Sequence, residues 1–231
     1  YKNIEKLRLI KKKSIMARIA RVVAPGYPHH ITQRGNRRQQ TFFSDEDYQA
    51  YIDFMHQWCD HCNVEIWCYC LMPNHIHLIA VPDTSEGLAS AIGEAHRRYA
   101  RMVNFREGWR GYFWQGRFAS FVLDESHLLA AARYIELNPV RAGLVKRPEE
   151  YRWSSCRAHL KLVKDSLVTV EPLLAYADKW DEFLHYPVDP VLRDALQKHE
   201  RTGRPLGSDA FINRLEIRMG RSLKKKKTGP K

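Results

Sequence analysis

The chain has 231 residues, of which 44% are hydrophobic and 28% are charged, and it carries a formal net charge of +12. This composition excludes an intrinsically disordered chain, and the lack of a long apolar run excludes a transmembrane helix and predicts a cytoplasmic location. Residues 1–21 and 218–231 each carry a net charge of +7, which leaves the body at −2. Basic ends on a nearly neutral body indicate an acidic partner. Nucleic acid fits better than a membrane surface, because no amphipathic helix with a broad apolar face accompanies them.

In chain order, hydrophobic periodicity and capping signals predict a strand, a helix, a hairpin of two strands, a helix, a strand and a helix. The predicted strands are about 29–34, 63–71, 75–81 and 117–123. The predicted helices are one that Ser44 caps, one at about 86–105, one that Asp124 caps and Pro139 stops, and a last one at about 209–219.

This order predicts an α+β fold of the ferredoxin-like type, β-α-β-β-α-β. We expect an antiparallel sheet with helices on one face and an open opposite face, plus a helix that carries Tyr134 and a helical C-terminal extension. Because Met16 opens a stretch that reads like a natural start, residues 1–15 are interpreted as a basic leader outside the fold. The body is expected at 16–158, the helical extension at 159–221 and a basic tail at 222–231.

Five cysteines make no disulfide framework in a chain of this size. Cys59 and Cys62 have the spacing of zinc ligands, and Cys68 and Cys70 follow shortly afterwards. However, Cys68 and Cys70 lie in an apolar strand-like run. Buried thiols behave as small hydrophobes, so core packing is the favoured interpretation of the cysteines.

His75 and His77 lie two residues apart in a predicted strand, so their side chains point to the same face. Two imidazoles in this arrangement can converge on one divalent cation. The alternative is an ordinary pair of histidines on a half-exposed strand. Tyr134 and Asn138 share one face of the following helix. His127 and Arg141 extend this polar stripe, whereas the apolar stripe consists of Leu128, Ala132 and Ile135.

Together these residues carry a family resemblance. Residues 74–79 (Asn-His-Ile-His-Leu-Ile) resemble the His-hydrophobe-His motif of HUH single-strand endonucleases. The segment 133–145, from Arg-Tyr-Ile-Glu-Leu-Asn-Pro-Val-Arg to Ala-Gly-Leu-Val, is similar to the tyrosine helix of REP-associated tyrosine transposases. Residues 114–118 and the stretch from 16–18 to 33–36 also match, so the resemblance covers 16–158. Beyond it, only 202–207 matches, and loosely.

The resemblance implies a transposase that cleaves single-stranded DNA next to hairpins and rejoins strands through a 5′-phosphotyrosine. Tyr134 would be the nucleophile. His75, His77 and Asn138 would bind Mg²⁺ or Mn²⁺, an ion choice that the absence of thiolates in the proposed site supports. REP-like hairpin DNA would be the partner of a monomer or homodimer in a bacterial cytoplasm. DNA binding is predicted for the arginines around the first and fourth strands, which are Arg34, Arg37, Arg38 and Arg117.

Three alternatives remain open. A non-catalytic hairpin-DNA-binding regulator on the same fold is disfavoured by the intact set of His75, His77, Tyr134 and Asn138. A plasmid replication initiator or relaxase is disfavoured by the short chain with one plausible catalytic tyrosine and no helicase motifs. A metal-independent RNA-binding protein leaves the histidine pair unexplained. The sequence identifies no general base.

Overall fold

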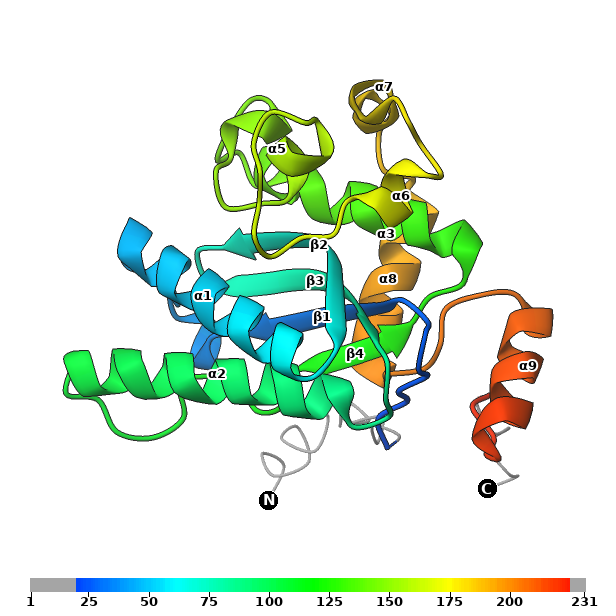
Figure 1. Cartoon of the computed structure of the whole chain (residues 1–231), viewed down its shortest axis with the longest axis horizontal. Helices are drawn as coiled ribbons and strands as arrows, with labels where there is room; N and C mark the ends of the chain where they lie inside the picture. The colour runs from blue at the N-terminus through cyan, green and yellow to red at the C-terminus, as the bar shows by residue number, and fades with distance from the viewer. Residues whose placement is uncertain (1–19, 225–231) are drawn as a thin grey trace, which may run out of the picture.

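The computed structural model describes residues 20–224. The predicted leader at 1–15 and most of the predicted basic tail at 222–231 lie outside the described residues. The sheet has the order β2-β3-β1-β4, and every neighbouring pair is antiparallel (Figure 1). This is the ferredoxin-like arrangement that the sequence predicts. The strands are β1 His29–Arg34, β2 Val64–Met72, β3 His75–Pro82 and β4 Ala119–Val122.

The helices agree closely with the predicted positions up to α3 and at α9. In chain order they are α1 Asp45–His61, α2 Gly87–Arg106, α3 Glu125–Glu136, α4 Asn138–Arg141, α5 Cys156–His159, α6 Glu171–Leu174, α7 Trp180–His185, α8 Pro190–Thr202 and α9 Asp209–Met219, with short 3-10 turns at Asn36–Arg38 and Pro148–Glu150. Asp124 caps α3 as predicted by accepting a hydrogen bond from the amide of His127. Ser44 occupies the cap position of α1, but its side chain makes no capping hydrogen bond.

Pro139 does not stop the helical path, contrary to the sequence prediction. It lies in the first turn of α4, which follows α3 after a single residue. Proline is tolerated in a first turn because the amide hydrogen that it lacks has no intrahelical acceptor there. The segment that carries Tyr134 and Asn138 is therefore two helical pieces.

Alternation along the strands divides the core between the two faces of the sheet. Ile31 of β1 and Ile76, Leu78 and Ala80 of β3 pack against α1 and α2, as their positions in the sequence predict. Ile79 and Phe121 point to the other face. A register shift in β2 between Ile66 and Cys68 reverses its alternation, so that Cys68 and Cys70 join this second core.

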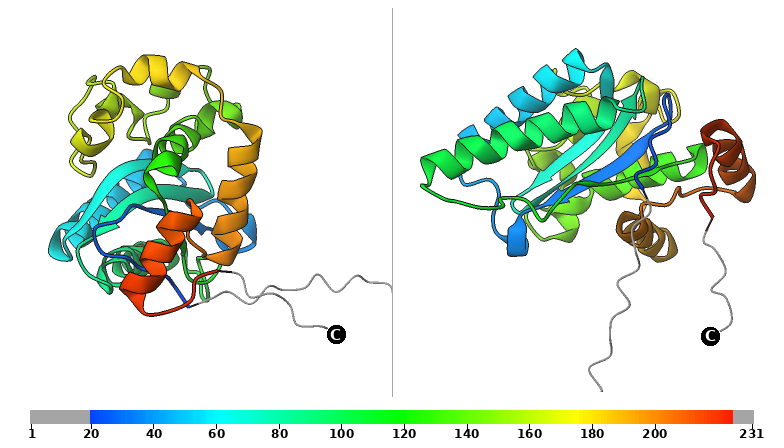
Figure 2. Two further views of the ribbon diagram at one scale, coloured as in Figure 1. Left: turned by 90° about the vertical axis from the view of Figure 1, so that its right-hand side faces the viewer. Right: turned by 90° about the horizontal axis from the view of Figure 1, so that it is seen from below.

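The second face is not open, which corrects the expectation from the sequence. Figure 2 shows the sheet between α1 and α2 on one side and α3 and α8 on the other. Residues from α3, α6, α7 and α8 pack there, including Leu128, Ile135, Leu173, Trp180 and Leu196. The apolar residues of the second face require this cover, because exposing them to water would cost free energy.

The two ends of the described chain meet beside β4. Phe211 and Leu215 of α9 pack on Val22, Ala24 and Val122. Arg221 Nη2 donates a hydrogen bond of 2.8 Å to the carbonyl of Arg21. Among the described residues, no helix is long and apolar enough to cross a membrane.

Buried neutral histidines are expected to make the stability of the fold depend on pH. Burial lowers the pKa of His96 from 6.5 to about 3, and its Nε2 lies 2.8 Å from the Tyr51 hydroxyl. In the unfolded chain this histidine takes up a proton near pH 6.5. Its contribution to the free energy of unfolding is therefore lost as the pH falls from 6.5 toward the folded-state pKa of about 3. At pH 5 the loss is about 2 kcal/mol for this one residue.

Urea unfolding at pH 7 and pH 5 measures this effect. In His96→Gln the amide side chain offers Tyr51 a hydrogen-bonding group in place of the imidazole but takes up no proton. We therefore expect its free energy of unfolding to fall by about 2 kcal/mol less than that of the wild type between these pH values. An equal fall in both proteins would contradict the assignment.

Candidate functional site

The histidine pair of β3 lies on the face covered by α3. In the antiparallel register, His77 lies opposite Thr32 and His75 lies opposite Arg34. The two imidazole rings are 5.0 Å apart between centroids and nearly perpendicular, with an interplanar angle of 78°. Their Nδ1 atoms are engaged, by Asn74 Oδ1 for His75 and by His30 for His77, and neither Nε2 has a hydrogen-bond partner in the described chain.

A third histidine, His30 of β1, belongs to this cluster and was missed by the sequence analysis. Its Nε2 lies 3.1 Å from His77 Nδ1, and its ring stacks on that of His77. The signal was present, because His30 alternates with Thr32 and Arg34, and β1 is a neighbour of β3 in the ferredoxin-like order. His30 Nδ1 is buried without a hydrogen-bond partner among the described residues.

The cluster is neutral at physiological pH. Burial lowers the pKa of His30 to about 3 and that of His75 to about 4, with the positive charges of Arg34 and Arg141 lowering that of His75 further. Burial also holds the pKa of His77 well below 6.5, and the neighbouring His75 and His30 add to the effect. Neutral imidazoles are the form that binds metal ions, so no proton must leave these rings first.

Tyr134 lies against this cluster. Its ring centroid is 5.7 Å from that of His77 and 6.3 Å from that of His30, in edge-on arrangements. The Arg141 guanidinium lies over the Tyr134 ring, 4.0 Å from its centroid. The Tyr134 side chain is largely buried, and a hydrogen bond between its hydroxyl and the Arg141 side chain works against the lowering of the Arg141 pKa by burial. The phenol ring thus lies between the histidines and the Arg141 side chain.

Asn138 is held by Arg141. Arg141 Nη2 donates to Asn138 Oδ1 at 2.8 Å, and Nη1 donates to the carbonyl of Tyr134 at the same distance. Neither His75 nor His77 is a hydrogen-bond partner of Asn138 in the region described. The Oδ1 atom keeps one lone pair for a further ligand, whereas Nδ2 is buried without an acceptor in that region. His127, the other polar residue of the predicted stripe, instead contacts Asp124 at the start of α3.

Comparisons with known proteins place the chain among relatives of one kind. The family model described as "Transposase IS200 like" matches residues 25–138. A REP-associated tyrosine transposase of Haemophilus influenzae is 28% identical over 116 residues, which are 46% of this chain and 66% of that protein. The chain is related to the REP-associated tyrosine transposases. The resemblance predicted from the sequence is thereby confirmed.

A solved REP-associated tyrosine transposase, bound to a REP hairpin, shares the fold with a TM-score of 0.54 and 20% sequence identity. The match covers 67% of this chain and 98% of that structure. The family model includes His30, His75, His77, Tyr134 and Asn138, whereas Arg141 and everything C-terminal to it lie beyond the matched residues.

Two of the four predicted DNA-binding arginines line one pocket with His75. This pocket, of about 280 Å³, includes Arg34 and Arg117. Arg37 and Arg38 lie instead in the exposed turn after β1, with positive φ angles of 53° and 64°. The turn is held against the β2–β3 hairpin by hydrogen bonds from Gly35 to Asn74 and from Thr41 to Pro73. In this relative of the transposases, all four arginines therefore lie near the strand ends that carry His75.

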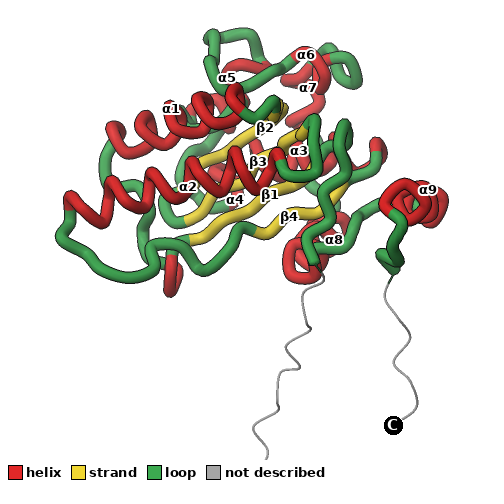
Figure 3. The backbone as a smooth tube through the Cα atoms, turned by 60° about the horizontal axis from the view of Figure 1, so that its bottom comes forward, coloured by secondary structure: helices red, strands yellow, loops and turns green. Residues whose placement is uncertain are grey.

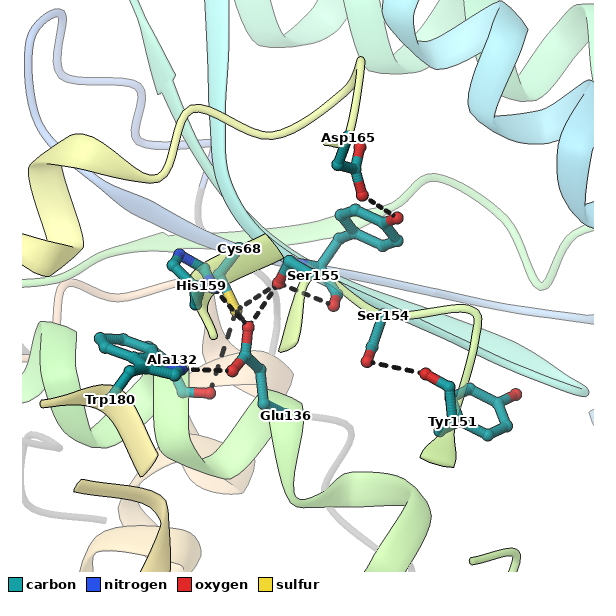
Figure 4. Close-up of polar contacts among 10 residues, drawn as sticks. Cys68, Ala132, Glu136, Tyr151, Ser154, Ser155, His159, Asp165 and Trp180 are labelled. Atoms are coloured by element: carbon teal, nitrogen blue, oxygen red, sulfur yellow. Dashed lines mark hydrogen bonds and ion pairs between the residues drawn. The ribbon is translucent and has the colours of Figure 1, made fainter. Parts of the chain in front are cut away.

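A buried carboxylate fixes the tyrosine helix. Glu136 of α3 is 0% exposed and accepts hydrogen bonds from Ser155 Oγ at 2.6 Å, His159 Nδ1 at 2.7 Å and Trp180 Nε1 at 2.7 Å (Figure 4). These donors come from the segments around α5 and α7. Glu136 lies two residues from both Tyr134 and Asn138. The network therefore sets the orientation of α3 over the sheet.

Proposed function

We propose that this protein is a metal-dependent single-stranded DNA endonuclease and strand transferase that cleaves next to DNA hairpins through a 5′-phosphotyrosine intermediate. The placement of the Tyr134 ring 5.7 Å from His77, beside a pair of neutral histidines, carries this proposal. The similarity to REP-associated tyrosine transposases supports it. We propose Tyr134 as the nucleophile and REP-like hairpin DNA as the partner, bound by a monomer or homodimer.

The chain's own residues supply positive charge and the attacking oxygen. Arg34 and Arg141 lie close enough to His75 to lower its pKa, so a phosphodiester beside His75 meets two guanidinium groups. Tyr134 Oη forms a bond to phosphorus while the bond from phosphorus to the 3′-oxygen breaks. The phenol proton passes to solvent, and the departing oxygen becomes a 3′-hydroxyl. Attack by a 3′-hydroxyl on the phosphotyrosine reverses these bond changes and rejoins a strand.

The chemistry of these donors suits a divalent cation. His75 and His77 offer neutral Nε2 atoms on rings 5.0 Å apart, and Asn138 Oδ1 offers a hard oxygen with one free lone pair. These three residues would hold Mg²⁺ or Mn²⁺. When bound, the ion supplies polarisation of a non-bridging phosphate oxygen and neutralises developing negative charge.

Incubation with single-stranded hairpin DNA from beside its own gene tests the proposal. In the presence of Mn²⁺ or Mg²⁺ we expect a covalent protein–DNA adduct that survives denaturing electrophoresis, and with EDTA we expect none. Hairpin binding without an adduct under any metal condition would favour a non-catalytic regulator.

His30 is expected to tune metal affinity through a hydrogen bond. For His77 to bind a cation through Nε2, its Nδ1 must carry the proton and donate to His30 Nε2, 3.1 Å away. His30→Phe keeps a ring against Phe121 and removes the acceptor. Because loss of such outer partners costs about 10–100-fold in metal affinity, we expect the Mn²⁺ dissociation constant from calorimetry to rise by that range. The matched control His96→Phe should leave it unchanged. Unaltered Mn²⁺ affinity in folded His30→Phe would contradict this tautomer assignment.

We also propose the domain organisation that the sequence predicts. Residues 16–158 would form the nuclease domain and 159–221 an extension that packs on it. The basic ends at 1–15 and 222–231 would attract the phosphate backbone. This arrangement suits an enzyme that acts on DNA in the bacterial cytoplasm.

A further inference from the structure

The pocket beside His75 contains a carboxylate from the C-terminal extension. Glu200, near the end of α8, lines the same cavity of about 280 Å³ as Arg34, Arg117, Gln115 and His75. Figure 3 shows α8 lying by β1 and β4. Glu200 lies well outside residues 25–138, which the transposase family model matches. The extension therefore adds an acidic group to a pocket whose other lining residues all lie within the matched region.

The position of Glu200 is fixed by the packing of α8. Leu196 is buried in the core under α3. The His199 ring packs near Phe121 of β4, and His199 Nδ1 lies 2.8 Å from the carbonyl of Arg204. The helix then ends at Gly203, whose left-handed φ of 69° suits a glycine. Glu200 thus extends into the pocket from a docked helix.

The charged groups of the pocket are not paired with one another. Within residues 20–224, the side chains of Arg34, Arg117 and Glu200 make no ion pair or hydrogen bond. Two guanidinium groups and a carboxylate therefore offer donors and acceptors to a ligand. A phosphate would satisfy the arginines but leave the Glu200 carboxylate without a donor, and a simple cation would meet repulsion from both arginines. A ligand that satisfies all three groups presents both an acceptor edge and a donor edge.

An unpaired nucleobase meets this requirement, and the pocket volume suits one base. Ligand pockets for larger molecules hold about 300–1,000 Å³. Guanine alone presents two adjacent N–H donors, N1–H and N2–H, that match both oxygens of one carboxylate. Its O6 and N7 atoms accept from an arginine fork. Thymine has one such donor between two carbonyl oxygens, which a carboxylate would repel.

Resting on the proposed function, we infer that this pocket binds an unpaired guanine of the DNA strand next to the reacting phosphate. Glu200 accepts hydrogen bonds from N1–H and N2–H, and Arg34 or Arg117 donates to O6 and N7. Glu200 is thus a specificity-determining residue that the C-terminal extension supplies.

Binding of the full chain to fluorescent hairpin oligonucleotides in EDTA tests this inference without requiring cleavage. Each unpaired guanine beside the hairpin is replaced in turn by inosine, which lacks the N2 amino group. At one position we expect the dissociation constant to rise about 5-fold or more, since a good base contact is worth about 1–3 kcal/mol. In Glu200→Gln this inosine penalty should largely disappear. The control Glu171→Gln, which alters an exposed glutamate of α6, should retain it.

Two results would overturn the inference. One is equal affinity for guanine and inosine at every unpaired position. The other is a Glu200→Gln protein that binds all oligonucleotides more tightly with an unchanged inosine penalty, which would mean that Glu200 only repels phosphate. Guanine discrimination without a covalent adduct under any metal condition would sustain the pocket and refute the proposed chemistry.

Discussion

Tyr134→Phe is expected to abolish the covalent protein–DNA adduct and to leave hairpin affinity nearly unchanged. The substitution removes the one oxygen proposed to attack phosphorus. The ring contacts with His77 and the Arg141 guanidinium do not involve the hydroxyl and should persist. Within the described chain the hydroxyl interacts with the Arg141 side chain alone, so its loss should change the free energy of unfolding by only about 1 kcal/mol. Denaturing electrophoresis with Mn²⁺ measures the adduct, and fluorescence anisotropy measures binding.

Tyr112→Phe is the matched control, because this tyrosine is 87% exposed in the loop between α2 and β4. Its adduct yield should equal that of the wild type. An adduct in Tyr134→Phe at wild-type yield would move the nucleophile elsewhere. Tyr151 would then be a poor substitute, because its hydroxyl donates a hydrogen bond to the carbonyl of Leu71.

Local patterns were sufficient to predict the strands and most of the framework. The alternation of Ile76, Leu78 and Ala80 with His75 and His77 gave the two faces of β3, and the structure confirms the buried side. Asp124 gave the start of α3 because a cap is a contact between residues three apart. Such signals lie within one element, where spacing in the sequence determines spacing in space.

Contacts between distant segments were not predictable in this way. His30 joins His77 across 47 residues, and Glu200 reaches the pocket of His75 from the far end of the chain. The second face of the sheet is covered partly by short helices such as α6 and α7. Helices this short show little hydrophobic periodicity, so the sequence did not predict that they pack there. Asn138 was predicted as a ligand from its place on a helix face, but its contact with Arg141 depends on the turn into α4. These features arise from tertiary packing, which one-dimensional patterns do not encode.

Glu136 is expected to be the residue whose loss costs the fold most. Glu136→Leu would leave the donors of His159 and Trp180 buried without their acceptor, whereas Ser155 Oγ keeps the carbonyl of Tyr69 at 3.2 Å. Removing one partner of a buried charged network costs about 3–5 kcal/mol. For a chain of this size that corresponds to a Tm lower by roughly 10 °C. Glu136→Gln should cost less, because the amide still accepts through one oxygen but turns an NH₂ group toward other donors.

Glu125→Leu, in the exposed first turn of the same helix, is the control and should cost less than about 1 kcal/mol. A Glu136→Leu protein as stable as this control would show that the network is dispensable. Activity then separates positioning from stability. Glu136 lies between Tyr134 and Asn138 in the sequence. At temperatures well below the Tm of the variant, Glu136→Gln should therefore lower the adduct yield, while hairpin affinity in EDTA stays constant. A yield that falls only as the protein unfolds would limit Glu136 to holding α5 and α7 in place.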